Sequence, residues 1–232
     1  FQTLIVKGGF LELENEAVLI RFAIGGREVF MNNVKFVFSF KVVPLEGRYL
    51  ISRIDLAKLL DPVLRPSSLE QKQIKAIIID AVGGGSDRGF TNSFGSAADF
   101  NLALAKKLKA RLWSTKLKVV MTRDSDRTVS LESRRGVVQR TKDAVVIQIR
   151  FNSGKTGRLQ GIETKVMEPG VGAGKNDGAN IALATAVHTT CLIMTGQPDN
   201  GISRTQTSLL KNIRHPGLII SGGFLDNPRD AK

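Results

Sequence analysis

The chain has 232 residues, of which 42% are hydrophobic and 24% are charged, a balance typical of a protein with a full core. Its formal charge of +13 favours an anionic partner, whether a cell-wall polymer, a membrane surface or a nucleic acid. An aromatic content of only 6% and the lack of a binding motif disfavour nucleic acid. The single cysteine, Cys191, excludes an intrachain disulfide and is predicted to be a buried, inert thiol.

The N-terminal part alternates apolar and polar residues over short runs that are broken by pairs of glycines, which predicts a small β-rich domain over residues 1–62. It ends in a segment, 54–60, whose apolar spacing predicts a short helix. Two prolines and two serines between 61 and 68 indicate that the helix does not continue, so we expect a linker over 63–73.

From residue 74 to residue 232, strands alternate with helices, which predicts an α/β domain: a mixed, mainly parallel sheet flanked by helices on both faces. The predicted strands cover 74–81, 118–122, 144–151, 161–167 and 218–220. The predicted helices begin after Ser96, after Ser130 and at Ala179. No stretch is long enough, on this reading, to span a membrane, and no signal peptide opens the chain. Because the first residue is Phe1, we expect that the start is trimmed.

Ligands of such sheets bind beyond the carboxyl ends of the strands, which directs attention to the glycine-rich loop 82–87. This loop has neither the Lys-Ser/Thr ending of a phosphate loop nor the spacing of a dinucleotide motif, so it indicates a tight turn rather than a nucleotide site.

Seven segments between 74 and 232 resemble, in order, the motifs of the zinc-dependent N-acetylmuramoyl-L-alanine amidases, which hydrolyse the peptide stems of peptidoglycan. The match begins with a strand that ends in Asp80 and runs through a glycine-rich loop to Asp87. The other segments are 99–105, 120–126, 130–134, 151–153 together with 161–164, 179–184 and 222–228. The resemblance implies the amidase fold, a bacterial envelope location (periplasmic or secreted) and a peptidoglycan or other anionic cell-wall polymer as partner. The N-terminal unit resembles, more loosely, a small β domain that precedes some of these enzymes.

In that family two histidines and one glutamate hold zinc and a second glutamate acts in proton transfer, so the resemblance implies four site positions. The residues of this chain at those positions are Gly83, Ala97, Arg150 and Ser221. None is a good zinc ligand, so no metal, no cofactor and no catalytic residue is expected as the sequence stands.

Other residues do not supply a replacement site. His188 falls among apolar residues of a helix, where packing is the simpler interpretation, and His215 precedes Pro216 at the opposite end of the last strand. Asp80 and Asp87, with Asn152, are expected to line a groove, and the two carboxylates alone make at best a weak hard-cation site.

Arg150 and Ser221 each allow two interpretations. A guanidinium at the former metal centre would bind a carboxylate, but a solvent-facing Arg150 explains the sequence equally well. Ser221 has no base that the sequence places nearby, so a polar filler is favoured over a nucleophile.

Three hypotheses follow. The first is an amidase-like domain of cell-wall metabolism that is catalytically inactive. The second is an active zinc amidase whose site is substituted or wrongly reported in this sequence. The third is a basic module that binds polyanions and is indifferent to peptide stems. The resemblance also suggests that the family's last helix is missing after Lys232.

Overall fold

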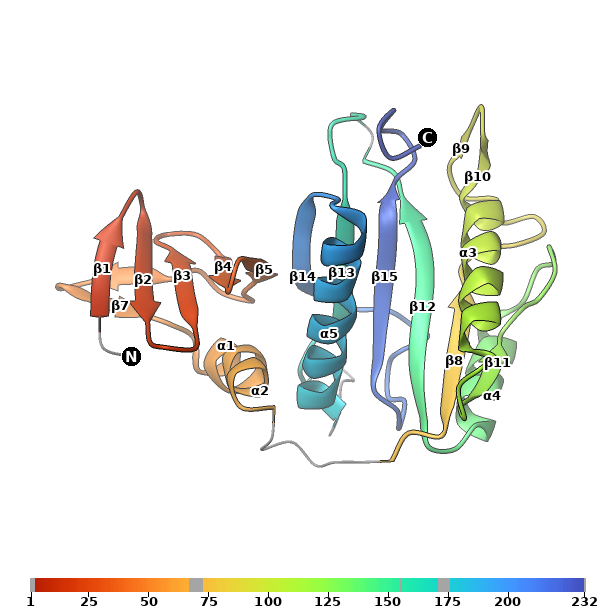
Figure 1. The fold of residues 1–232 in the computed structure, drawn as a ribbon, viewed down its shortest axis with the longest axis horizontal. Helices are drawn as coiled ribbons and strands as arrows, with labels where there is room; N and C mark the ends of the chain where they lie inside the picture. The colour runs from red at the N-terminus through yellow and green to blue at the C-terminus, as the bar shows by residue number, and fades with distance from the viewer. Residues whose placement is uncertain (1–2, 67–72, 155, 171–175, 232) are drawn as a thin grey trace.

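The computed structural model describes residues 3–66, 73–154, 156–170 and 176–231 (Figure 1). Its main feature is an 11-stranded sheet with the order β1-β2-β3-β4-β5-β14-β13-β15-β12-β8-β11. The second half of this order is mixed and mainly parallel, and helices cover both of its faces, so the predicted fold class is confirmed.

The N-terminal strands form an antiparallel meander, as the alternating pattern predicted. They are β1 (Thr3–Lys7), β2 (Phe10–Glu14), β3 (Leu19–Ala23), β4 (Glu28–Met31) and β5 (Val34–Val37), followed by the hairpin β6 (Val43–Leu45) and β7 (Arg48–Leu50). The meander joins the rest of the sheet where Phe36 pairs with Ile202. The division into two domains stays a prediction.

The helix predicted over 54–60 is longer than expected. Consecutive helical turns, α1 (Arg53–Asp55), the π-helical η1 (Leu56–Leu60) and α2 (Asp61–Leu64), run past Pro62 and into the predicted linker. A proline has no N–H for the ordinary helical ladder, and the wider π-turn directly before it accommodates that loss. The helix therefore ends at Leu64 rather than before Asp61, and most of the remaining linker, 67–72, lies outside the described residues.

The strands of the C-terminal part lie close to their predicted positions. They are β8 (Ala76–Ala81), β11 (Lys118–Met121), β12 (Ala144–Asn152), β13 (Ile162–Met167) and β15 (Gly217–Phe224), with a small hairpin of β9 (Thr91–Asn92) and β10 (Gly95–Ser96). Every residue of β8 is buried, as expected of a strand covered on both faces. The hairpin of β9 and β10 was not predicted, and neither was the strand β14 (Asp199–Thr205).

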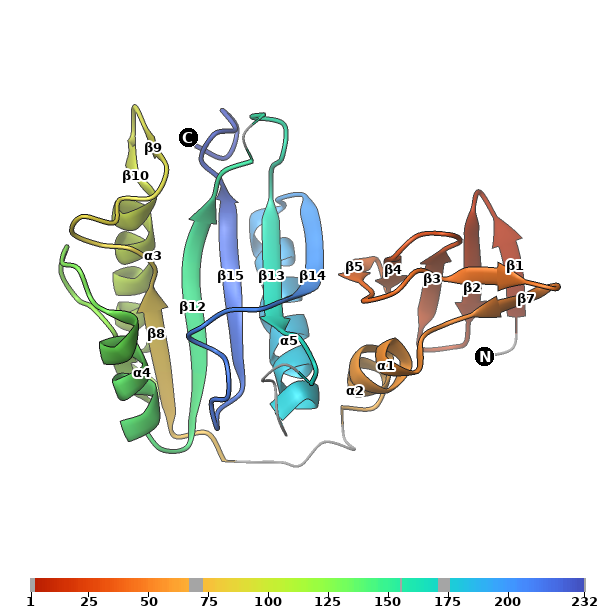
Figure 2. The ribbon, with the colours of Figure 1, turned by 180° about the vertical axis from the view of Figure 1, so that it is seen from behind.

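Three helices flank this part. Helices α3 (Ala97–Leu112) and α5 (Asp177–Thr195) lie on the face that Figure 1 shows, and α4 (Leu131–Arg140) lies on the other face, toward the viewer in Figure 2. Ser96 and Asp99 form the predicted reciprocal cap of α3, and the Ser130 hydroxyl caps α4. The first turn of α3 is thereby fixed beside the carboxyl end of β8.

The expectation that no segment is long enough to span a membrane is wrong for helix α5. Its 19 residues are long and apolar enough by length and composition. It packs on β13, β14 and β15 instead, and Ile181, Ala184 and His188 are fully buried there. The His188 ring hydrogen-bonds Thr164 Oγ1 and Asp199 Oδ1, both at 2.9 Å. These bonds hold one side of α5 in the fold, while only 22% of its apolar window is buried.

Candidate functional site

The glycine-rich loop after β8 follows a backbone path that only glycine adopts easily. Gly83, Gly84 and Gly85 have φ values of 76°, 117° and 61°. A Cβ on Gly83 would lie 2.7 Å from the carbonyl oxygen of Asp87, and one on Gly84 would lie 2.5 Å from that of Arg127. The loop is therefore a tight turn, as predicted, and its backbone passes close to its neighbours.

Two buried arginines hold this loop in place. Arg134, 8% exposed, donates from Nη1 to Asp80 Oδ1 at 2.6 Å and from Nη2 to the Gly83 carbonyl at 2.8 Å. Arg123, 1% exposed, donates to the carbonyls of Ala81 and Ala98, both at 2.8 Å. Burial, together with repulsion from Arg134, lowers the pKa of Arg123. The two guanidiniums thus tie the end of β8 to the first turn of α3.

A small pocket of about 170 Å³ opens between that loop, the start of α3 and the end of β12. Gly83, Ala97 and Arg150 line it, so three of the four positions singled out from the sequence converge. Ser221 is the register partner of Arg150 on the neighbouring strand β15, but it is 2% exposed and does not line the pocket. Its hydroxyl donates to the Gly223 carbonyl at 3.2 Å.

Arg150 is the half-buried cation of this pocket. Its Nε is buried and has no hydrogen-bond partner in the part of the chain that the structure describes, and its guanidinium forms no ion pair there. The same holds for one acceptor in the lining, Asn101 Oδ1, whereas the Asn101 amide nitrogen donates to the Val82 carbonyl at 3.0 Å. Buried polar atoms usually find partners, so these two atoms, which have almost no solvent-accessible surface, are exceptions in the lining of this pocket.

The other charged residues that line the pocket are Asp87 and Arg88, of which Arg88 is paired. Arg88 forms ion pairs with Asp99 at 2.5 Å and Asp126 at 2.6 Å. Hydrogen bonds from Ser96 lower the pKa of Asp99. Asp87 is exposed, lines the pocket and has no ion-pair partner among the described residues. The pocket therefore presents one unpaired cation, Arg150, and one unpaired carboxylate.

A family model described as N-acetylmuramoyl-L-alanine amidase matches residues 77–232. The chain belongs to the N-acetylmuramoyl-L-alanine amidase family. The resemblance seen in the sequence motifs is thus confirmed, and this part of the chain is an amidase-like domain.

Individual relatives agree. The N-acetylmuramoyl-L-alanine amidase CwlM of Bacillus licheniformis is 28% identical over 158 residues, which cover 67% of this chain and 59% of that protein. The catalytic domain of the amidase CwlV of Bacillus (Paenibacillus) polymyxa var. colistinus has 28% identity and a TM-score of 0.60, with 67% of this chain and 84% of that chain covered. An amidase of Clostridium difficile 630 has 27% identity and a TM-score of 0.62, covering 68% and 84%. This chain thus spans little more than half of the curated relative.

The amidase family is generally zinc-dependent, so we tested whether the residues at the pocket fit a zinc ion. They offer a glycine, a methyl group, a guanidinium and a hydroxyl that is already hydrogen-bonded. No group of three or more His, Cys, Asp or Glu residues within 3–66, 73–154, 156–170 and 176–231 is placed to hold a metal. Zinc requires deprotonated sulfur, imidazole or carboxylate ligands, so this donor set does not fit it.

Both histidines of this amidase domain lie elsewhere. His188 is a fully buried residue of α5, in agreement with the packing interpretation. His215 is 4% exposed, and its Nε2 lies 3.2 Å from the Val138 carbonyl at the amino end of the sheet. Burial lowers the pKa of His215 below its ordinary 6.5.

Two of the three expected groove residues need correction. Asp80 is fully buried and accepts hydrogen bonds from Thr122, Arg134 and Gln148 at 2.6–2.7 Å, so it cannot contact a ligand in the groove. Asn152 is 8% exposed and donates to Glu163 at 2.8 Å, outside the pocket lining. Only Asp87 lies where it was expected.

Sequence reasoning missed Asn101 and Arg88 as lining residues. Asn101 lies inside one of the matched amidase segments, four residues after the start of α3, and an asparagine on the buried side of a helix was the signal available. Arg88 gave no signal, because its partners lie 11 and 38 residues away in the sequence.

Proposed function

We propose that this domain is a non-catalytic member of the amidase family that binds the stem peptide of peptidoglycan at the cell envelope, outside the cytoplasm. The observation that carries the proposal is the unpaired guanidinium of Arg150 in the family's site pocket. The Arg150 guanidinium places a fixed positive charge where the family holds its metal ion. A guanidinium binds carboxylates but does not activate water.

A stem peptide suits the polar atoms of this pocket. Its carboxylate pairs with the Arg150 guanidinium, while an amide or amino N–H donates to the exposed carboxylate of Asp87. The pocket's volume of about 170 Å³ fits one residue of such a peptide rather than a whole stem. A charge-assisted bond to a buried arginine contributes roughly 1.5–3 kcal/mol, about ten- to a hundredfold in affinity.

The described residues that line the pocket include none of the arrangements that hydrolysis of an amide requires. Acyl transfer to water needs a general base or a metal, and a hydroxyl nucleophile needs an adjacent base. Ser221 is buried and its hydroxyl is bonded to a carbonyl, while the two histidines lie outside the pocket. We therefore expect the domain to bind stem peptides and leave them intact.

Binding is tested by isothermal titration of a soluble muramoyl-peptide into the full chain and into two variants of equal charge. Arg150→Gln removes the pocket cation, and we expect at least about tenfold weaker binding. Arg214→Gln removes an exposed cation at the amino end of the sheet, and we expect no change. Equal binding by all three proteins contradicts the proposal.

Catalysis is tested separately by incubating the chain with purified peptidoglycan and measuring free stem peptide. We expect none above the buffer control. Release by the unaltered chain supports the second hypothesis, an active zinc amidase. The assignment of the site is tested by restoring the family residues at all four positions, with Gly83→His, Ala97→Glu, Arg150→His and Ser221→Glu. Gly83→His is the most difficult of the four, because the backbone at Gly83 has a positive φ and a Cβ there would lie too close to its neighbours.

A further inference from the structure

The far end of α3 carries a concentration of positive charge that the proposed peptide pocket does not use. Residues 100–123 contain no aspartate or glutamate, and six exposed cations fall between 106 and 118. These are Lys106, Lys107, Lys109, Arg111, Lys116 and Lys118, and none forms an ion pair within the described residues. The nearby carboxylate of Asp143 is already paired with Lys75 at 3.6 Å.

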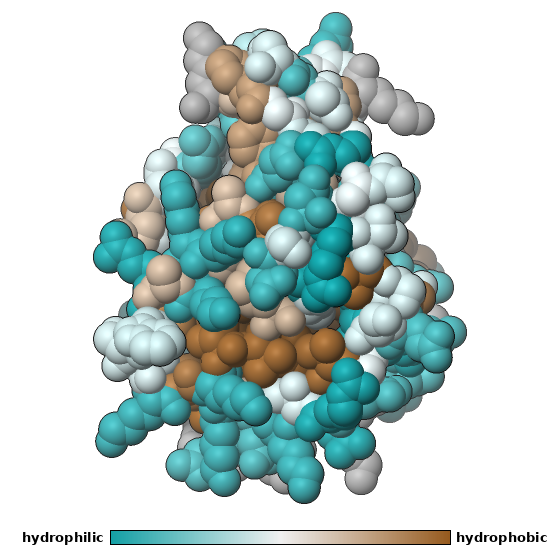
Figure 3. Space-filling view, turned by 90° about the vertical axis from the view of Figure 1, so that its right-hand side faces the viewer, coloured by the Kyte–Doolittle hydropathy of each residue, from teal (hydrophilic) through white to brown (hydrophobic). Residues whose placement is uncertain are grey.

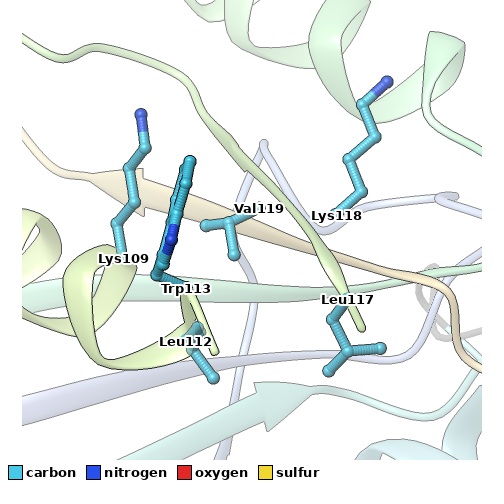
Figure 4. A pocket seen from close by; sticks show the side chains of 6 residues that line it. All are labelled: Lys109, Leu112, Trp113, Leu117, Lys118 and Val119. Atoms are coloured by element: carbon cyan, nitrogen blue, oxygen red, sulfur yellow. The ribbon is translucent and has the colours of Figure 1, made fainter. Parts of the chain in front are cut away.

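An exposed indole lies in the middle of these cations. Trp113, at the C-terminal end of α3, is 86% exposed, the highest value among the large hydrophobic residues of the described chain. Figure 4 shows the Trp113 ring beside the Lys109 side chain, with Lys118 on the far side of Val119 and both lysines directed to the same side. Leu112 and Leu117 complete the lining of a groove of about 260 Å³.

The groove lies on the outer edge of the sheet, where β11 is the last strand. Figure 3 shows this side of the molecule, with an apolar band between hydrophilic atoms. The groove is at the opposite end of α3 from the peptide pocket: the helical rise is about 12 Å from Asn101 of the pocket to Lys109 of the groove, and about 24 Å from Ala97 to Trp113. A ligand here is therefore separate from one at Arg150.

Helix stability explains only part of this arrangement. Lys109 and Arg111 lie in the last turn of α3, where cations favour the helix dipole. Lys116 and Lys118 lie beyond the helix, where that argument does not apply, and an exposed indole does not stabilise a helix end. Unpaired cations around an aromatic face are complementary to an anionic ligand that also carries an apolar ring face.

We propose that the groove formed by Lys109, Trp113 and Lys118, which we call the Trp113 groove, binds a sugar–phosphate polymer. A sugar ring stacks on the indole, and the phosphates on either side of it pair with the flanking cations. A bilayer surface fits less well, because the apolar side chains line a hollow and only Trp113 projects fully into solvent. A nucleic-acid strand fits less well because the groove offers one aromatic ring rather than a series.

The test uses the fact that Trp113 is the only tryptophan, so intrinsic fluorescence reports on this groove alone. The probe is poly(ribitol phosphate) that carries N-acetylglucosamine, titrated into the full chain. We expect a blue shift of the emission, protection from acrylamide quenching and an affinity that falls steeply with salt. Binding without any change in Trp113 emission overturns the proposal.

Variants separate the groove from general charge attraction. We expect Trp113→Ala to weaken binding about tenfold, followed by calorimetry since the fluorophore is lost. We expect Lys109→Gln with Lys118→Gln to reduce the slope of log affinity against log salt by about two. Lys7→Gln with Lys41→Gln removes the same charge from the N-terminal unit and should change the slope much less. Equal slopes for the two double variants contradict the proposal.

Two further probes distinguish other polyanions. Phosphatidylglycerol vesicles and single-stranded DNA of mixed sequence are titrated under the same conditions. We expect both to bind more weakly than the sugar–phosphate polymer at equal phosphate concentration. Tighter binding of either probe overturns the assignment of the ligand.

Discussion

The buried pair of Arg134 and Asp80 gives the sharpest test of how the site loop is held. Arg134→Met keeps a long side chain but removes a guanidinium that donates to Asp80, to the carbonyls of Ala81, Gly83 and Val129, and to Thr122. The Asp80 side chain is only 1% exposed, so its charge then stays buried with two neutral donors, Thr122 and Gln148.

Removing one partner of a buried ion pair costs roughly 3–5 kcal/mol, because the other charge is left uncompensated. We expect Arg134→Met to lower the free energy of unfolding by about that amount, and the melting temperature by about 6–20 °C for a chain of this length. Far-ultraviolet circular dichroism in urea measures the first quantity. Tryptophan emission is unsuitable, because Trp113 is already exposed in the folded protein.

Two further variants make this result decisive. Arg140→Met, an exposed arginine of the same helix, should change the free energy of unfolding by less than about 0.5 kcal/mol. Asp80→Asn combined with Arg134→Met should be more stable than Arg134→Met alone, because the buried charge is gone. A cost below about 1 kcal/mol for Arg134→Met, or a double variant that is no more stable, refutes the reasoning.

Gly83→Ala should destabilise the fold by about 1–3 kcal/mol in the same assay, because φ is 76° and the Cβ would lie 2.7 Å from the Asp87 carbonyl oxygen. Gly8 also has a positive φ, 56°, but a Cβ there would have no atom within 4 Å, so Gly8→Ala should cost only about 1 kcal/mol. Equal losses of unfolding free energy for the two variants would exclude a role for the contact between the Gly83 Cβ and the Asp87 carbonyl. Burial lowers the pKa of His215, so the unfolded chain binds a proton at this residue more tightly than the folded chain does. The neutral His215 therefore contributes its full share of the free energy of unfolding above about pH 6.5, the ordinary pKa. That share is lost as the pH falls from 6.5 toward the pKa of the folded state. His215→Asn should therefore flatten the stability difference between pH 7.5 and pH 5.5, and an unchanged difference would contradict this assignment.

The fold was predictable wherever local pattern and burial agree. The apolar run of β8 and the reciprocal cap of Ser96 and Asp99 need only neighbouring residues, and both are present as expected. Strand β14 was missed because its sequence, Asp-Asn-Gly-Ile-Ser-Arg-Thr, has no apolar alternation. Distant partners specify it instead, since Asp199 accepts from the Lys35 amide and hydrogen-bonds the His188 ring.

The site was predictable in position but not in detail. The rule that ligands lie beyond the carboxyl ends of parallel strands brought Gly83, Ala97 and Arg150 to one pocket. The burial of Asp80 was not predictable, because its cation comes from Arg134, 54 residues later in the chain. Whether Arg150 lines the pocket or faces solvent also depends on packing between distant elements, and the structure answers it in favour of the pocket.

The central claim is that the family's site, as this chain builds it, has no donor set for a transition metal. Its most direct test is the zinc content of the purified full chain, measured by mass spectrometry after equilibration with excess zinc and removal of the unbound metal. We expect far less than one zinc per chain, and the same content in Arg150→Gln. About one tightly held zinc per chain would contradict it.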